Sequence, residues 1–330
     1  MRGDGDGDAM RCDGARGDCD NERMRVETGP TKLINHAARA AAEVVAEALG
    51  YDEAAASALV RRGGLWVDRA RVRDPQATIA ADAMVFIHTP PPHARRLDLT
   101  RPTILYEDDD LIAIDKPAGA YVEATPWDAD DHLRAALSAL RPAAPIHLAH
   151  RLDRDTSGVL LLSKNPAVNA ALQRSFAGHM AHKTYLAGCG GLPTWDELEI
   201  VTGHGRSANG VFRVYAADRV GERLADGSSV KEMATRLRVL WRSFAQADGA
   251  ALVAAEPITG RTHQIRLHLA HLGHPLLGDA KYGGASAWDG AALDAHLLHA
   301  LRLTLPHPRG GELTIEAPAP EWTRALERLS

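Results

Sequence analysis

Residues 147–163 read HLAHRLDRDTSGVLLLS, a polar loop that leads into a short apolar run. The run at 159–163 is continuous rather than alternating, which is typical of a strand buried on both faces. Gly158 joins the loop to this run, and glycine permits backbone conformations that other residues avoid. The sequence therefore predicts a charged loop at the end of a central strand.

Asp153 lies in the middle of this loop, between Arg151 and Arg154. A carboxylate flanked by arginines at the end of a buried strand can be held ionised, and it can then act as a nucleophile or a base. The alternative is a structural aspartate that caps a turn, because aspartate is common in turns. From these residues alone the structural interpretation is favoured.

Short strands and helices follow one another irregularly on both sides of the loop. Strands are predicted at 104–106, 111–114, 182–188, 211–215, 234–242, 250–256, 299–305 and 312–316, and helices at 131–140, 166–177, 262–272 and from Pro320 onward. This irregular order predicts an α+β fold with a mixed, mostly antiparallel sheet.

Composition divides the chain into four segments. Residues 1–30 are rich in Gly, Asp and Arg without apolar periodicity, which predicts a disordered tail. Residues 31–89 predict two helices and a small hairpin, a compact α/β module. The linker 90–101 begins with three prolines, and 102–330 forms the second domain.

The formal net charge of -5 argues against a protein that coats RNA by bulk charge, but a local basic face could still bind it. No apolar run is long enough to predict a membrane span. The three cysteines form no CxxC pair, so neither a disulfide framework nor a zinc site is expected. A reducing cytoplasm fits this cysteine usage.

The segment HRLDRDTSG at 150–158 resembles the signature loop of RluA-type pseudouridine synthases. Three further parts of the chain resemble that family in the family's order. They are LYEDD with KPAG (105–109 and 116–119), KTY (183–185), and TGRTHQIRLH with GHPLLGD (259–268 and 273–279). The resemblance covers about 102–305. One departure is VEA at 122–124, where the family continues towards Val-His-Pro, which puts a local contact in doubt.

The resemblance implies a catalytic role for Asp153, for Tyr185, which stacks on the uracil ring, and for Arg266, which pairs with Asp153. It also implies that Arg151 inserts into the RNA where the target base has been flipped out. The remaining residues assigned to RNA binding are Lys116, Arg261 and His263.

Each assignment has an alternative. Tyr185 could be a core aromatic of a sheet, Arg266 a surface charge, and Lys116 a side chain that only reaches along the surface. A metal site could be built from His263, His268, His271 and His274. No metal is expected, because these histidines are spaced around a helix and its end without a carboxylate at ligand spacing.

The N-terminal segment ALVRRGGLWVD at 58–68 resembles a small RNA-binding domain shared with a ribosomal small-subunit protein. The opening Arg-Leu-Asp of that domain is absent, and Leu33-Ile34-Asn35 stands in its place. The alternative is a small helical cap without RNA contact.

The implied function is isomerisation of specific uridines to pseudouridine in RNA, with large-subunit ribosomal RNA expected first and transfer RNA second. No cofactor is expected, because the reaction involves no redox change and no external group. Asp153 could attack the sugar or the base, or remove a sugar proton. We expect a cytoplasmic monomer without a membrane or an obligate protein partner. The competing functions are an RNA-binding protein that has lost catalysis and a metal-dependent hydrolase.

Overall fold

The computed structural model describes residues 9–11, 29–91, 98–99, 101–207, 211–244 and 249–328. The chain packs as two compact units. The large unit consists of 1–25, 102–118 and 144–330, and the small unit consists of 26–101 and 119–143. The predicted division into 31–89 and 102–330 differs from these units at 119–143, which pack with the small unit. Most of the predicted disordered tail lies outside the described residues.

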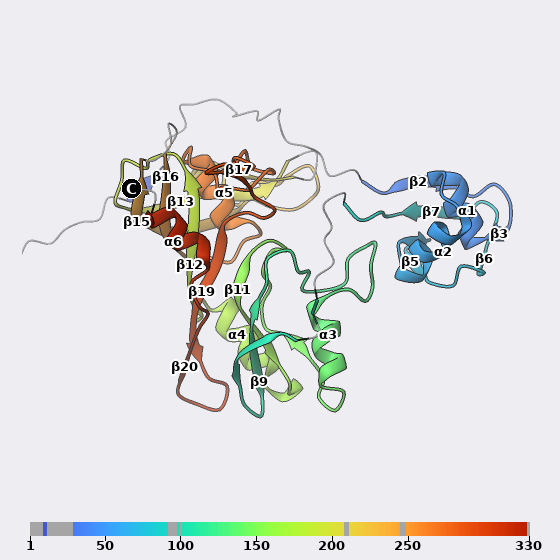
Figure 1. The fold of residues 1–330 in the computed structure, drawn as a ribbon, viewed down its shortest axis with the longest axis horizontal. Helices are drawn as coiled ribbons and strands as arrows, with labels where there is room; N and C mark the ends of the chain where they lie inside the picture. The colour runs from blue at the N-terminus through green and yellow to red at the C-terminus, as the bar shows by residue number, and fades with distance from the viewer. Residues whose placement is uncertain are drawn as a thin grey trace, which may run out of the picture. The chain divides into compact units, whose positions relative to one another are not determined.

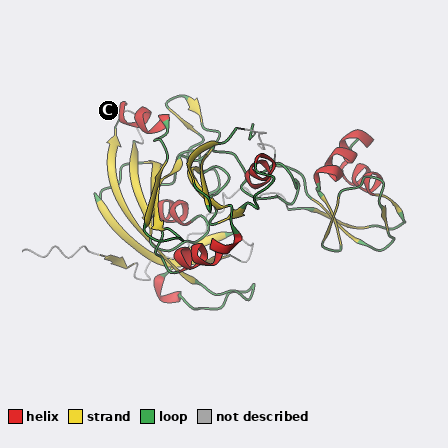
Figure 2. Cartoon of the chain, turned by 90° about the horizontal axis from the view of Figure 1, so that it is seen from below, coloured by secondary structure: helices red, strands yellow, loops and turns green. Residues whose placement is uncertain are grey.

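A twelve-stranded sheet forms the framework of the large unit (Figure 1). Its strands are β1 (Ala9–Arg11), β8 (Thr103–Glu107), β9 (Leu111–Lys116), β10 (His147–Leu148), β11 (Ser157–Ser163), β12 (His182–Gly190), β13 (Glu197–Arg206), β14 (Phe212–Tyr215), β15 (Lys231–Ser243), β16 (Ala250–Pro257), β19 (Leu298–Pro306) and β20 (Glu312–Glu316). The order along the sheet is β1-β13-β15-β16-β12-β19-β11-β9-β8, with β10, β14 and β20 paired beside it. Among the strands that the structure describes in this sheet, only β1–β13 and β11–β19 pair in parallel, so the mixed, mostly antiparallel sheet is confirmed. Figure 2 shows the long strands curving.

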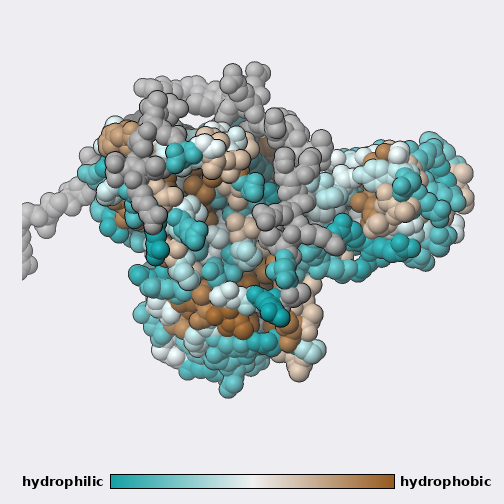
Figure 3. Space-filling view, in the orientation of Figure 1, coloured by the Kyte–Doolittle hydropathy of each residue, from teal (hydrophilic) through white to brown (hydrophobic). Residues whose placement is uncertain are grey.

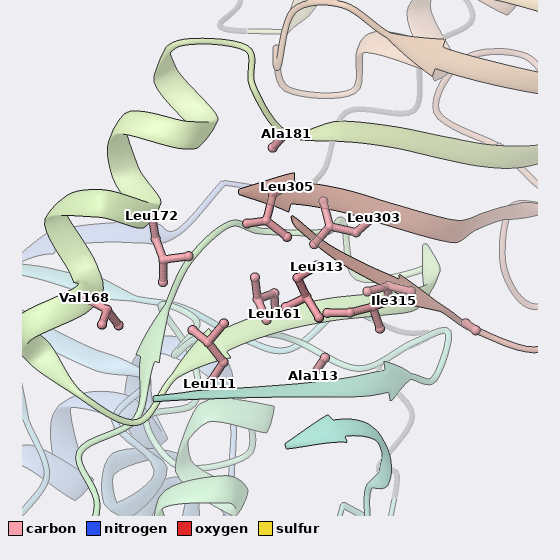
Figure 4. Packing of buried hydrophobic residues seen from close by; sticks show 12 residues of the cluster. Leu111, Ala113, Leu161, Val168, Leu172, Ala181, Leu303, Leu305, Leu313 and Ile315 are labelled. Atoms are coloured by element: carbon pink, nitrogen blue, oxygen red, sulfur yellow. The ribbon is translucent and has the colours of Figure 1, made fainter. Parts of the chain in front are cut away.

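The helices of the large unit are α4 (Asn169–Ala177), α5 (Gln264–His271) and α6 (Glu321–Arg328), with one-turn helices at Pro166–Val168 and Ala217–Arg219 and a two-stranded ribbon of β17 (Ala287–Trp288) and β18 (Ala291–Ala292). Figure 4 shows how Leu172 of α4 and Leu161 of β11 point into one apolar cluster with Leu303 of β19 and Leu313 of β20. The run at 159–163 is fully buried, as its continuous apolar pattern predicts. This packing fixes the strand that the charged loop precedes.

Strand β13 was not predicted from the sequence ELEIVTGHGR. Its two glycines depress strand propensity, because glycine contributes no side chain to the sheet. Here they make room for neighbours: a Cβ on Gly203 would lie 2.6 Å from Val230, and one on Gly205 would lie 2.6 Å from Leu224. Tertiary packing therefore outweighs local propensity.

Two helices of the small unit, α1 (Ala41–Leu49) and α2 (Glu53–Arg62), pack on a four-stranded sheet. Its strands are β2 (Thr31–Ile34), β4 (Leu65–Val67), β5 (Ala70–Val72) and β7 (Met84–Ile87), with β3 (Arg39–Ala40) and β6 (Thr78–Ile79) as a separate pair and α3 (Leu133–Leu140) as a third helix. Gly50 ends α1 in a left-handed conformation, and Asp52 caps α2 by accepting a hydrogen bond from the Ala55 amide. The predicted break at 50–52 therefore separates two helices.

An acidic segment, residues 125–131, forms ion pairs with two arginines of residues 26–101, the other part of the small unit. Asp128 lies 3.1 Å from Arg62, and Asp130 accepts hydrogen bonds from both terminal nitrogens of Arg73. The indole of Trp66 donates to the carbonyl of Pro126 at 2.8 Å. These contacts explain why 119–143 belongs to the small unit although it follows β9 in the chain.

Within the described residues, no helix is long and apolar enough to cross a membrane. Much of the face drawn in Figure 3 is hydrophilic, and hydrophobic residues gather around the part of the large unit that holds β9 and β11.

Candidate active site

A buried lysine fixes the backbone of the charged loop between β10 and β11. Lys116, at the end of β9, has no exposed surface. Its ammonium donates to the carbonyls of Arg154, Thr156 and Pro117 at 2.6, 2.8 and 2.9 Å. Burial lowers the pKa of Lys116 to about 7, against the opposing charges of Asp155 and Asp153. Lys116 thus holds the loop on both sides of residue 155.

The end of the same loop is fixed against β19. Gly158 has φ +101°, and a Cβ there would lie 2.2 Å from the carbonyl oxygen of Ala300, so only glycine fits. The hydroxyl of Thr156 lies 2.9 Å from Nε2 of His296, and that of Ser157 lies 2.8 Å from Nδ1 of His299. Burial lowers the pKa of His296 well below its usual value, so the buried imidazole is neutral.

Asp153 meets Arg266 across the site. Nη1 of Arg266, on α5, donates to Oδ2 of Asp153 at 2.9 Å. Nε and Nη2 of the same guanidinium donate to the two oxygens of Asp279 at 2.7 and 2.9 Å. Burial alone would lower the pKa of Arg266, but the hydrogen bonds and charge of Asp279, together with Asp153, raise it overall. The side chain of Asp153 keeps 27% of its surface exposed, so a substrate can reach it.

His263 lies near the same oxygen of Asp153. Its Nε2 is 3.8 Å from Oδ2 of Asp153, and its Nδ1 is 2.6 Å from the hydroxyl of Tyr282. Burial lowers the pKa of His263 to about 4, although Asp153 opposes the shift, so the imidazole is neutral at pH 7. The backbone of His263 is left-handed, with φ 57°, immediately before α5.

Strand β19 brings Tyr185 towards the loop. Ala300 of β19 is paired with Gly158 on one side and with Tyr185 of β12 on the other. The pairing of β12 with β19 shifts register between Thr184 and Tyr185. Burial, and then the charge of Asp153, raise the pKa of Tyr185 well above 10, so its hydroxyl stays protonated at neutral pH.

The other residues expected to contact RNA fall into two groups. Arg151 is exposed beside Asp153, and Arg261 is partly exposed while its Nε donates to the carbonyl of Glu232 at 2.8 Å. Lys116 is fully buried and is not presented to solvent. We therefore place Lys116 under the loop rather than among the residues that face RNA.

Sequence reasoning assigned no role to Asp279, Tyr282 or His296, which the structure places around the Asp153 loop. A usable signal was present for Asp279: an arginine buried in a helix needs a counter-charge, and a carboxylate follows 13 residues later. Nothing local marks His296, because its partner Thr156 is 140 residues away.

The histidines of α5 and its end point to different partners. His268 lies 3.0 Å from the Thr202 hydroxyl and 2.8 Å from that of Thr235, whereas His274 faces the carbonyl of Gly190. Among the described residues, no group of three His, Cys, Asp or Glu side chains could hold a metal ion. The arrangement supplies instead an accessible carboxylate, a buried guanidinium and a neutral phenol, which suit acid–base or nucleophilic chemistry on an organic substrate.

Comparison with known proteins gives one consistent family. The RNA pseudouridylate synthase family model matches residues 110–271. RNA pseudouridine synthase 1 of Arabidopsis thaliana is 40% identical over 68% of this chain and 77% of its own length. Ribosomal large subunit pseudouridine synthase C of Escherichia coli strain K12 is 31% identical over 93% of this chain and 99% of its own. The solved structure of human RNA pseudouridylate synthase domain containing 1 has a TM-score of 0.56 at 25% identity and covers 71% of this chain and 97% of that one.

Proposed function

The chain belongs to the RluA-type family of RNA pseudouridine synthases, isomerases that act on RNA, and we propose that its substrate is large-subunit ribosomal RNA and that Asp153 is its catalytic carboxylate. The observation that carries the role of Asp153 is its partly exposed side chain, paired with the buried guanidinium of Arg266. The substrate is supported by similarity over nearly the whole chain to a protein named for the large ribosomal subunit.

The reaction breaks the C1′–N1 bond of uridine and forms a C1′–C5 bond, while C5 loses a proton and N1 gains one. No atom is added and no electron is transferred. A stacked base is out of reach, so the nucleotide must flip into the site at a cost of roughly a few kcal/mol. In the proposed mechanism Arg151, exposed beside Asp153, fills the space that the base leaves.

Tyr185 would stack on the flipped uracil, because an aromatic ring is a suitable platform for a pyrimidine. Its hydroxyl stays protonated, so we assign it no role as a base. Asp153 acts on the nucleotide itself, and the hydrogen bond from Arg266 holds its carboxylate in place. Arg261 and His263 are proposed to contact the RNA close to the target.

Residues 31–89 are proposed as an accessory RNA-binding module, joined by the linker 90–101 to the catalytic domain, 102–330. The module carries cations at Arg61 and Arg62, at the end of α2, and at Arg71 and Arg73 on and after β5. Two of them are paired with carboxylates, Arg62 with Asp128 and Arg73 with Asp130. The cytoplasmic location and the monomeric state stay predictions, which cell fractionation and light scattering would test.

The test is pseudouridine mapping of total RNA from cells that lack this gene and carry wild type, Asp153→Ala or Asp109→Asn. Asp109 is an exposed carboxylate in the turn between β8 and β9 and serves as the matched control. We expect one or more sites in large-subunit ribosomal RNA to vanish on deletion and to return with wild type and Asp109→Asn only. A site that returns with Asp153→Ala would refute the role of Asp153, and a site in transfer RNA would refute the substrate.

A further inference from the structure

The two oxygens of Asp153 have different surroundings. Oδ2 accepts the hydrogen bond from Nη1 of Arg266 at 2.9 Å and is also the oxygen nearest to His263, at 3.8 Å. Among the described residues, Oδ1 takes part in no hydrogen bond or ion pair. One oxygen is therefore held by the protein, and the other is available to a substrate.

The guanidinium that holds Oδ2 is itself held by a second carboxylate. Asp279 binds Nε and Nη2 of Arg266, the pair of donors on the side away from Asp153. Asp279 is 2% exposed and Arg266 is 7% exposed, so water does not compete for these bonds. The ring of Tyr282 lies 5.0 Å from the guanidinium carbon and stacks on the same group.

This arrangement leaves Arg266 one orientation. A two-point contact to a carboxylate fixes the plane of a guanidinium, and the aromatic ring restricts movement out of that plane. The remaining donor, Nη1, then points at Oδ2 of Asp153. Without Asp279, Nε and Nη2 would need new acceptors in a buried site, and Arg266 would turn towards Asp153 with two donors instead of one.

The histidine next to Asp153 supports the same assignment. If Nε2 of His263 were unprotonated, its lone pair would face the Asp153 carboxylate, which is unfavourable. The favoured tautomer has the proton on Nε2, the nitrogen 3.8 Å from Oδ2, and Nδ1 then accepts from the hydroxyl of Tyr282. Arg266 and His263 thus both face the same oxygen.

We propose that Asp279 is a positioning residue of the isomerase: it orients Arg266 so that Oδ2 of Asp153 is held and Oδ1 is the oxygen that acts on the uridine. Asp279 touches no substrate in this scheme and acts only through Arg266. The inference rests on the proposed role of Asp153.

The first experiment compares Asp279→Asn with Asp110→Asn. Asp110 is also a buried aspartate that binds Nε and Nη2 of an arginine, Arg309. It lies between β8 and β9, and its side-chain hydrogen bonds within the described residues go to Arg309 and Asn165, outside the Asp153 loop. Both variants lose one buried carboxylate of an aspartate–arginine pair. We measure unfolding by urea, RNA affinity by filter binding, and the single-turnover rate on the RNA that the mapping experiment identifies.

We expect both variants to be less stable than wild type and to bind RNA within twofold of wild type. Only Asp279→Asn should lower the single-turnover rate, by roughly 10- to 100-fold, the effect of a small misplacement of a reacting group. A folded Asp279→Asn variant with a rate within threefold of wild type would overturn the proposal. An equal loss of rate in Asp110→Asn would do the same, since it would reflect general destabilisation.

A second variant covers the case in which Asp279→Asn does not fold. Arg266→Lys keeps a cation for Asp279, but an ammonium cannot hold two carboxylates in the fixed geometry of a guanidinium fork. We expect its rate to fall by a similar factor. Wild-type turnover in folded Arg266→Lys would refute positioning through Arg266.

Asp153→Ala separates this proposal from the function on which it rests. If Asp153→Ala is inactive while Asp279→Asn keeps the wild-type rate, only the positioning role fails. If Asp153→Ala remains active, the catalytic assignment fails, and the positioning role fails with it.

Discussion

Lys116→Met tests whether burial of a single ammonium controls how stability depends on pH. Methionine is similar in length and has no charge, so the substitution removes the titrating group without opening a large cavity. Lys116 has no exposed surface, and burial lowers its pKa from the ordinary value of 10.5 to about 7. Between these two values, the unfolded chain binds a proton that the folded protein does not.

The sign and size of the effect follow from this difference in bound protons. Stability rises with pH wherever the unfolded state binds more protons, so wild type should gain stability as the pH rises from about 7 towards 10.5. One pKa unit corresponds to about 1.4 kcal/mol, which gives about 5 kcal/mol over the whole range. From pH 7 to pH 9 the gain is about 2 kcal/mol, since Lys116 is already half deprotonated at pH 7.

The assay is urea unfolding of wild type and Lys116→Met at pH 6, 7, 8 and 9. Other titrating groups are common to the two proteins, so the difference between their free energies of unfolding isolates Lys116. We expect that difference to change in favour of wild type by about 2 kcal/mol between pH 7 and 9. A difference that stays constant with pH would refute the reasoning, because it would mean that the three carbonyls keep Lys116 protonated despite its burial.

Three further outcomes are expected. Gly158→Ala should lower the free energy of unfolding in urea by roughly 2–5 kcal/mol, because its Cβ would overlap the Ala300 carbonyl. In the control Gly221→Ala, where the glycine has φ +94° and open space around it, the free energy of unfolding should fall by less than half as much. Tyr185→Phe should keep most of the single-turnover rate and the same pH–rate profile between pH 6 and 10, since the phenol does not ionise there. Tyr185→Ala should lower the rate, because it removes the aromatic ring on which the uracil stacks. A change of the rate at high pH that disappears only in Tyr185→Phe would contradict this expectation. The double variant Asp128→Asn with Asp130→Asn should raise the affinity for polyuridylate roughly 3- to 10-fold, because it frees Arg62 and Arg73. Filter binding measures this affinity, and Glu53→Gln with Asp82→Asn is the charge-matched control. An equal effect in both double variants would mean that net charge alone causes the change.

The local sequence pattern predicted those elements that are determined by their own residues and their immediate neighbours in the chain. The continuous apolar run at 159–163 forms the buried strand β11, and Gly50 to Asp52 separates two helices because these residues supply caps. The pairing of Arg266 with Asp153 was implied by resemblance, and the two side chains meet although they are 113 residues apart. No periodicity in the sequence could have supplied that contact.

Features that depend on distant partners could not be predicted. Strand β13 could not be predicted from the sequence, because it contains two glycines. Those glycines are needed there because Val230 and Leu224 pack against them. Lys116 was assigned to RNA binding through the family resemblance, but its ammonium is buried and donates to the carbonyls of Arg154, Thr156 and Pro117. Segment 125–131 could not be assigned to the small unit, because its partners Arg62 and Arg73 lie more than fifty residues earlier.

The acidic net charge of the chain is compatible with RNA chemistry, because the charges that matter here are paired inside the large unit. Arg266 balances Asp153 and Asp279, and Arg154 forms two hydrogen bonds with Asp155. A buried charge is stable only when its partner is held in good geometry, so each pair also fixes the backbone that carries it. Asp153 is consequently positioned by two lines of contact, one through Lys116 to the backbone of its loop and one through Arg266 to its side chain. These two sets of contacts come from different elements, β9 and α5. Loss of either set should therefore displace the carboxylate of Asp153, while the remaining set still supports the fold.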